Sequence, residues 1–173
     1  MAISLYDASV AGFIQIATAM SGVLDRGLSH CTENGTDPEA LVETRLFADM
    51  APLRFQIVSV VHHSIDAIDG VKAGVFTPPT DQRAHDYAGL QKLIADALSR
   101  LKALSQEEVN SLEGKDVVFQ VRDFKMPFIA ENFLLSFSVP NFHFHATTAY
   151  DILRSQGVPL GKRDYMGALR LKA

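Results

Sequence analysis

Apolar residues return at steps of three and four along four long segments of this 173-residue chain, and no other feature limits its fold as strongly. That spacing places apolar side chains on one face of an α-helix. It predicts long helices over residues 4–33, 52–74, 90–104 and 130–156. Because each apolar face must be buried against another, the fold class is predicted to be all-α, with the four helices forming a four-helix bundle.

Turn-forming residues mark the limits of these helices. Asn34-Gly35 predicts a left-handed helix end, and Pro38 predicts the start of a short helix that reaches residue 46. Pro52 suits the first turn of the second long helix, because proline there lacks an N–H that would have no partner anyway. That helix is expected to end near Gly74.

Between the third and fourth helices the pattern changes to that of β-strands. Residues 116–121 (DVVFQV) and 124–128 (FKMPF) flank Arg122-Asp123 and predict a small hairpin, with Pro127 on an edge strand. The prolines within residues 76–80 predict a loop after the second helix.

Three smaller features complete the expected organisation. Residues 105–108 (SQEE) resemble a capped entry to one further helical turn. Pro140 predicts either a kink within the fourth helix or a break between two helices. Residues 158–173 contain no helix long enough to stand alone, and residues 162–164 are read as a solvated turn.

Charge and cysteine content exclude several classes of protein. The 16 basic and 20 acidic residues give a net charge of -4, so we expect no nucleic-acid or membrane partner. Cys31 is the single cysteine, which excludes an internal disulfide and favours a cytoplasmic location. Residues 1–20 predict neither a signal peptide nor a membrane span. One domain over residues 1–173 is expected, large enough to be stable without a metal.

Histidines are the main candidates for chemistry. His62-His63 lies on the second helix, and a regular helix would place the two side chains on opposite shoulders, at the boundary of the core. On the fourth helix, His145 falls on the apolar face and His143 at its edge. His145 is either a buried, hydrogen-bonded neutral side chain or a ligand or base. No HxxxH or ExxH pair is present, which argues against a regular helical metal site.

The fourth helix is also rich in phenylalanine. Its four phenylalanines are expected to be core residues, with a subunit interface or the wall of a ligand pocket as the alternatives; they are Phe133, Phe137, Phe142 and Phe144.

Several stretches resemble one protein family. Residues 140–154 (PNFHFHATTAYDILR) and 157–167 (GVPLGKRDYMG) resemble the signature of the family called domain of unknown function 1993, and residues 45–53 (RLFADMAPL) resemble its second-helix region. That family is similar in fold to the DinB- and YfiT-like group. The resemblance implies a four-helix bundle that often dimerises, can carry a three-histidine metal site, and has thiol-dependent transferases among its relatives.

Carried over by position, the resemblance implies one metal ligand at His63 or His62 on the second helix and another at His145 on the fourth. The remaining positions of the pattern, Asn141 and Ala149, do not carry usual ligands for zinc or nickel. We therefore favour no metal over a divalent zinc or nickel ion. The expected protein is a DinB-like homodimer with a degenerate metal or small-molecule site near these histidines. The alternative is a metal-dependent transferase or hydrolase acting on a small, thiol-linked substrate.

Overall fold

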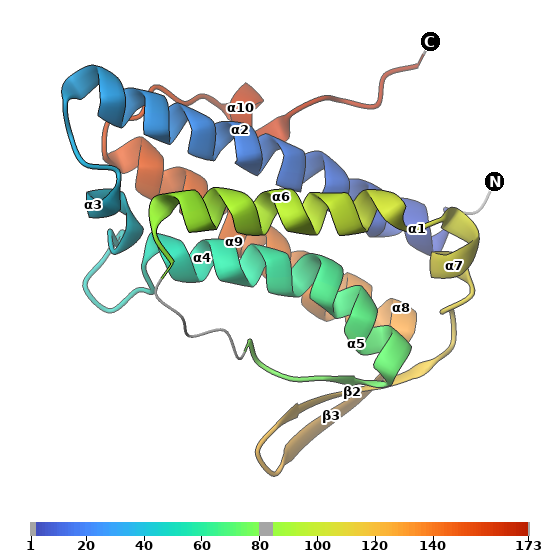
Figure 1. Cartoon of the computed structure of the whole chain (residues 1–173). Coiled ribbons are helices and arrows are strands. Elements are labelled where there is room, and N and C mark those ends of the chain that lie inside the picture. The colour runs from blue at the N-terminus through green and yellow to red at the C-terminus, as the bar shows by residue number, and fades with distance from the viewer. Residues whose placement is uncertain (1–2, 80–84, 173) are drawn as a thin grey trace.

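Four long helices run side by side in the computed structural model, which describes residues 3–79 and 85–172 (Figure 1). Helix α2 packs against α6 and α9, and α4 packs against the same two helices, so the order around the bundle is α2, α6, α4, α9. Their bounds are Val10–Asn34 for α2, Leu53–Val61 for α4, Tyr87–Ala103 for α6 and Val139–Ser155 for α9. The predicted all-α bundle is confirmed.

A π-helical turn follows one of these helices, and another precedes a second one. Helix α4 runs directly into the π-helical turn η1 (His62–Asp66) and then α5 (Ala67–Ala73). Helix α9 is preceded without interruption by α8 (Ala130–Phe133) and the π-helical turn η2 (Leu134–Ser138). A π-helical turn holds more residues than an α-helical turn, and such turns are often found at functional sites.

The predicted helix limits at glycine are confirmed. Gly35 ends α2 with φ 65°, and Gly74 ends α5 with φ 75°. Helix α2 starts later than expected, because the backbone at Ser9 (φ -130°, ψ -77°) separates it from the one-turn helix α1 (Leu5–Ala8).

Pro140 lies inside a continuous helical run, so of the two alternatives the single helix is correct and the break into two separate helices is not. Proline cannot donate to the carbonyl four residues back, and its ring crowds that carbonyl. The wider turn η2 directly before Pro140 accommodates this misfit. The Asn141 side-chain amide donates to the Phe137 carbonyl at 2.7 Å and supports the same turn.

A three-stranded sheet covers one end of the bundle (Figure 1). The predicted hairpin is confirmed as β2 (Asp116–Val121) and β3 (Phe124–Ile129), and Pro127 lies on the edge strand β3. Strand β1 (Val75–Phe76) pairs in parallel with β2. The prediction of loop at Phe76 was therefore wrong. Gly74 turns the chain so that its carbonyl accepts from Val118 N at 3.0 Å, which starts the pairing; Thr80 lies outside the described residues.

The short helices follow the sequence in part. Helix α7 (Gln106–Asn110) begins as predicted, with the Ser105 hydroxyl accepting from Glu108 N at 3.0 Å. The helix expected to reach residue 46 is only the turn α3 (Glu39–Val42). Helix α10 (Lys162–Met166) is a short turn that packs on α2.

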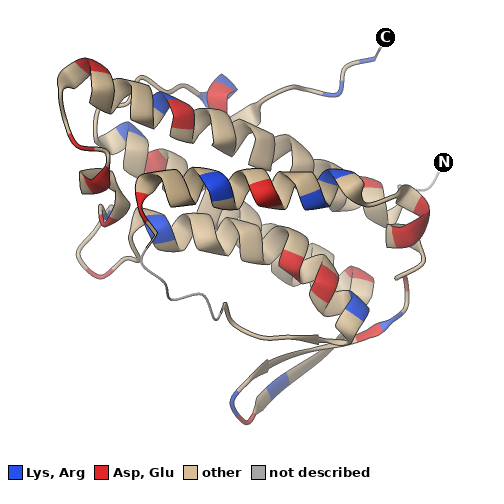
Figure 2. Cartoon of the chain, in the orientation of Figure 1, with Lys and Arg blue, Asp and Glu red and all other residues tan. Residues whose placement is uncertain are grey.

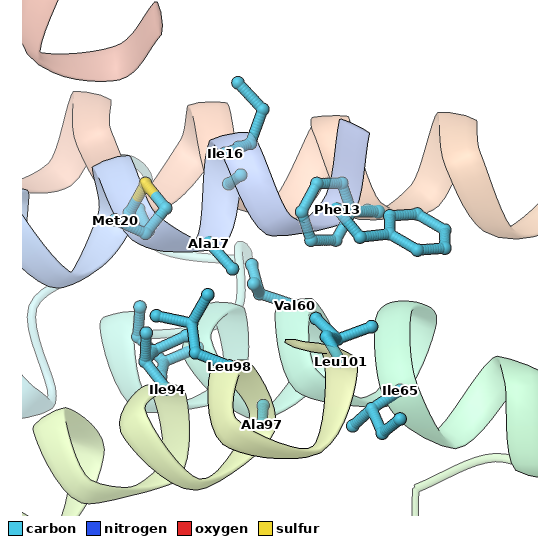
Figure 3. Close-up of a cluster of buried hydrophobic side chains, with 14 of the residues drawn as sticks. Phe13, Ile16, Ala17, Met20, Val60, Ile65, Ile94, Ala97, Leu98 and Leu101 are labelled. Carbon is cyan, nitrogen blue, oxygen red and sulfur yellow. The ribbon is translucent and has the colours of Figure 1, made fainter. Parts of the chain in front are cut away.

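The core fills the space between α2, α4 and α6 with interlocking apolar side chains (Figure 3). Phe13 and Met20 come from α2, while Ile94 and Leu101 come from α6, and all four are almost completely buried. Among the described residues, one helical stretch, Leu5–Asn34, is long and apolar enough to cross a membrane, and half of its most apolar window is buried in this bundle. Its apolar face is used for core packing.

Candidate functional site

The turn η1 brings both histidines of the second helix into the interior. His62 and His63 are each only 8% exposed, so the expectation that they lie on solvated shoulders was wrong. The projection assumed a regular α-helix, whereas the π-helical turn changes the direction of the side chains within it. Phe76 of β1 also covers His62, and the two rings are stacked at a centroid distance of 4.3 Å.

His145 joins this pair from the fourth helix. Its ring lies nearly parallel to that of His63, with centroids 5.8 Å apart and an interplanar angle of 11°. Its Nδ1 lies 2.8 Å from Oε1 of Gln56. Because an amide oxygen only accepts, Nδ1 of His145 carries the proton and the lone pair is on Nε2. We call His62, His63 and His145 the histidine cluster.

His143 lies apart from the cluster, as the helical spacing predicts. Its Nδ1 is 3.1 Å from the hydroxyl of Tyr165 in α10, and its side chain is half-buried. Burial lowers the pKa of His143. His143 therefore contributes to packing between α9 and α10 rather than to the cluster.

Desolvation holds His63 and His145 in their neutral form. Desolvation, followed by the charges that His62 and His145 would carry, lowers the pKa of His63 from 6.5 to about 3. Desolvation, followed by His62, lowers the pKa of His145 from 6.5 to about 4. At neutral pH both rings are uncharged and each has a free lone pair, which is the state that a metal or a hydrogen-bond donor requires.

The two π-helical turns contain every buried side-chain nitrogen or oxygen that lacks a partner in the described part of the chain. These atoms are Nε2 of His62, Nδ1 of His63 and Oγ of Ser138. The turns meet at the cluster, because the ring of Phe137 in η2 lies 5.7 Å from that of His63. A buried polar atom without a partner is costly, so a water or a ligand that bound these atoms would be stabilised here.

The cluster has the donor chemistry of a zinc or nickel site but not its placement. Metal-bound imidazoles point their lone pairs at one ion from within their ring planes, and the other nitrogen commonly donates to a carbonyl, as His145 does to Gln56. The rings of His63 and His145 are nearly parallel, however, with centroids 5.8 Å apart, and Nδ1 of His145 is bound by Gln56. Over residues 3–79 and 85–172, no three His, Cys, Asp or Glu side chains are grouped as a metal site requires.

A cavity of about 480 Å³ lies directly beside the cluster. Helices α4, α5 and α6 form its sides, and β1 with residues 77–79 forms its end. More than half of the lining residues are apolar. His62 is part of its wall. A volume of this size is in the range of pockets that bind small molecules.

One charged network lines the same cavity. Arg100 of α6 pairs with Asp66 at 3.4 Å and with Asp69, and the other oxygen of Asp66 lies 3.6 Å from Nδ1 of His62. Figure 2 shows these elements side by side, with acidic residues on the segment after α4 and basic residues along α6. The network therefore links the cavity to the histidine cluster.

Sequence reasoning did not single out this network or Phe76. Arg100 stands 34 residues from Asp66, and only the packing of α6 on η1 brings them together. Asp66 and Asp69 do have a helical i, i+3 spacing, which was a usable signal for a shared acidic face. Of the four phenylalanines, Phe133 and Phe142 are buried core residues, whereas Phe144 is 59% exposed.

Comparisons with known proteins agree with this architecture. The family model described as "Domain of unknown function (DUF1993)" matches residues 5–166. The chain is also similar to a crystal structure of a DinB family member protein from Shewanella denitrificans, with 26% sequence identity and a TM-score of 0.79. That likeness covers 98% of this chain and 95% of the other. A search of curated proteins found no significant match.

Proposed function

Because the chain belongs to the domain of unknown function 1993 family and has a DinB-like fold, we propose that it binds a small organic molecule in the cavity beside the histidine cluster. In this proposal the three-histidine metal centre of the wider group is degenerate. The observation that carries the proposal is the position of His62, whose buried Nε2 has no partner and whose ring forms part of the wall of a 480 Å³ cavity.

The ring of His62 is fixed in its place in the cavity wall. Its Nδ1 faces the carboxylate of Asp66, and Phe76 fixes its ring by stacking. A carboxylate next to one ring nitrogen favours the tautomer with the proton on that nitrogen, which leaves a lone pair on the other. The ring is thus held in one orientation before any ligand arrives, which lowers the entropy cost of binding.

A pair of matched variants tests whether ligands bind in this cavity. Val75 is 43% exposed in β1 and lines the cavity, so Val75→Trp would fill it while keeping a residue that strands accept. Val121 is 36% exposed in β2 and is not in the cavity wall, so Val121→Trp is the control. Saturation-transfer NMR with a library of small apolar fragments at 1 mM would measure binding to each protein.

We expect fragments that bind the unaltered protein and Val121→Trp to lose their signal with Val75→Trp. Detection at 1 mM corresponds to a binding free energy of about -4 kcal/mol, which a pocket of this size can supply. The proposal is wrong if no fragment binds the unaltered protein, or if Val75→Trp binds the same fragments equally well.

The second candidate function is a metal-dependent transferase or hydrolase acting on a small, thiol-linked substrate. The unpartnered nitrogens of His62 and His63 favour it, since a bound ion would satisfy both. His145 would supply Nε2 as a further ligand after its ring turns away from the stack on His63. When bound, a zinc or nickel ion would supply Lewis-acid activation of a water or thiol.

Metal analysis of untagged protein grown with zinc, nickel and iron decides between the two candidates. We expect less than about a tenth of an equivalent of any of them, because the described His, Cys, Asp and Glu side chains are not grouped as a metal site requires. About one equivalent that is lost in His63→Phe would instead support the metal-dependent enzyme.

A further inference from the structure

We propose that the ligand of this cavity is an organic amine, with an apolar body and a positively charged ammonium group that binds beside Asp69 and Asp66. This inference rests on the proposed function and names the class of ligand. Three observations support it: the balance of charge in the cavity wall, the free carboxylate oxygen of Asp69, and the apolar character of the remaining wall.

The charge balance of the wall favours a cation. Among the described residues, its charged members are two carboxylates, Asp66 and Asp69, and one guanidinium, Arg100. In this described part of the wall, one negative charge is therefore left without a basic residue. Lys72, the lysine nearest in sequence to Asp69, pairs with Glu108 at 2.5 Å and does not line the cavity. A ligand ammonium would supply the missing positive charge.

The wall also has a free acceptor for the ammonium. Arg100 binds Oδ2 of Asp69, and within the described residues Oδ1 of Asp69 has no hydrogen-bond partner. A carboxylate has room for about four hydrogen bonds, so Asp69 can bind Arg100 and an ammonium together. Hydrogen bonds between charged groups are about twice as strong as neutral ones.

An anionic ligand is disfavoured by the same arrangement. Arg100 is the one basic residue in the described part of the wall, and its guanidinium is already shared between Asp66 and Asp69. A carboxylate or phosphate that bound the remaining N–H donors of Arg100 would lie next to both acidic side chains. Like charges at such distances repel, so an anion should bind more weakly than a neutral analogue.

The rest of the wall suits an apolar body rather than a second polar group. The side chains that form it come from α4, α6 and the segment around β1, and they include Val58, Val61, Leu93, Val75, Phe76 and Pro78. Burial of apolar ligand surface against them would supply most of the affinity, while the carboxylates would choose the charge of the ligand.

A set of three ligands with the same ring tests the inference. At pH 7.5, 2-phenylethylamine is a cation, 2-phenylethanol is neutral and phenylacetate is an anion. Their dissociation constants would be measured by NMR titration with the unaltered protein, with Asp69→Asn, and with Asp96→Asn as the control. Asp96 is an exposed carboxylate on α6 that pairs with Lys92 at 2.6 Å and does not line the cavity.

The amine should bind at least about tenfold more tightly than the alcohol, and phenylacetate should bind most weakly. Asp69→Asn should remove this preference for the amine without weakening the alcohol, and Asp96→Asn should change neither. Equal binding of amine and alcohol, or a preference that survives Asp69→Asn, would overturn the inference and leave the proposed function standing. Failure of all three ligands, together with failure of the fragment library, would overturn the proposed function itself.

Discussion

The imidazole rings of His63 and His145 are stacked, with centroids 5.8 Å apart and planes only 11° from parallel, although one residue follows α4 and the other lies in α9. The two rings pack together in their neutral form. Desolvation, followed by the charges of neighbouring histidines, lowers the pKa of both side chains. The consequences for stability, association and binding can be measured.

Stability should fall as the solution is acidified from pH 7 to pH 4. The pKa of His63 is about 3 in the folded chain and 6.5 when unfolded, so in this range the unfolded chain binds a proton that the folded chain does not. Unfolding is then favoured by acid, and the stability that His63 contributes is complete only above pH 6.5. At pH 5 the loss from His63 is on the order of 2 kcal/mol.

Urea unfolding at pH 7 and pH 5 measures this loss, and His63→Phe tests its source. Phenylalanine keeps the aromatic packing but cannot take up a proton, so the variant should lose less stability between the two pH values than the unaltered protein. An identical pH dependence in both proteins would show that His63 is not responsible.

Replacing Gln56 should destabilise the protein. Gln56 is 2% exposed, its Oε1 accepts from Nδ1 of His145 and its Nε2 donates to the Ala51 carbonyl at 2.9 Å. Gln56→Leu leaves both partners unsatisfied, which should cost about 1 to 3 kcal/mol in urea unfolding. Gln91→Leu is the control, because Gln91 makes only an exposed hydrogen bond to Asp25 and should change stability by less than about 0.5 kcal/mol. Equal effects would contradict the role given to Gln56.

Gly27 is required by the close approach of Tyr87. A Cβ at Gly27 would lie 2.2 Å from the Tyr87 hydroxyl, which donates to the Leu24 carbonyl at 2.8 Å. Gly27→Ala should therefore destabilise the protein by about 1 to 3 kcal/mol, despite the higher helix propensity of alanine. Gly22→Ala, in the same helix with nothing within 4 Å, should instead stabilise it slightly.

Removing the Tyr87 hydroxyl should relieve this clash. In a double-mutant cycle measured by thermal unfolding, Gly27→Ala with Tyr87→Phe should be more stable than the sum of the single effects, by at least about 1 kcal/mol. Additive effects would show that the hydroxyl is not the obstacle.

Exposed aromatic side chains next to the cluster favour a homodimer. Phe144 of α9 and Phe55 of α4 both contact the edge of His145, with centroid distances of 5.3 Å and 5.8 Å. Phe144 is 59% exposed and Phe55 is 38% exposed, so the two rings form an exposed apolar patch that a second subunit could cover. Light scattering after size exclusion should give a dimer for the unaltered protein and a larger monomer fraction for Phe144→Ser.

The control for the dimer is Phe124→Ser. Phe124 is equally exposed, at 58%, but lies on the hairpin rather than on α4 or α9. It should leave the dimer intact. A monomeric unaltered protein would contradict the proposed association, and dissociation by Phe124→Ser alone would place the interface on the hairpin.

The fold could be predicted from sequence because its main determinants are local. Apolar spacing and the caps at Gly35 and Gly74 are encoded in neighbouring residues, so the long helices and their ends were predicted closely. The hairpin was predicted from the β-rich runs over residues 116–121 and 124–128, which flank its turn. Strand β1 could not be predicted, because two residues become a strand only by pairing with β2, more than 40 residues later.

The site was only partly predictable for the same reason. The interior direction of His145 follows from its place on a regular part of α9. His62 and His63 were misplaced because a π-helical turn leaves no clear mark in a single sequence, and the angle of 100° per residue fails across it. The cavity depends on the packing of α6 against η1 and β1, which brings together residues that no local pattern connects.

Methyl NMR during a titration with a bound fragment tests the central claim most directly, because it reports where the ligand lies. The claim predicts that methyl signals of Val58, Val61 and Leu93, which line the cavity, shift with the ligand, while those of Leu24 and Val23 in the core of α2 do not. The imidazole signals of His62 should shift with the same dissociation constant. Shifts confined to residues outside the cavity wall, with His62 unchanged, would contradict the claim that this chain binds a small molecule beside its histidine cluster.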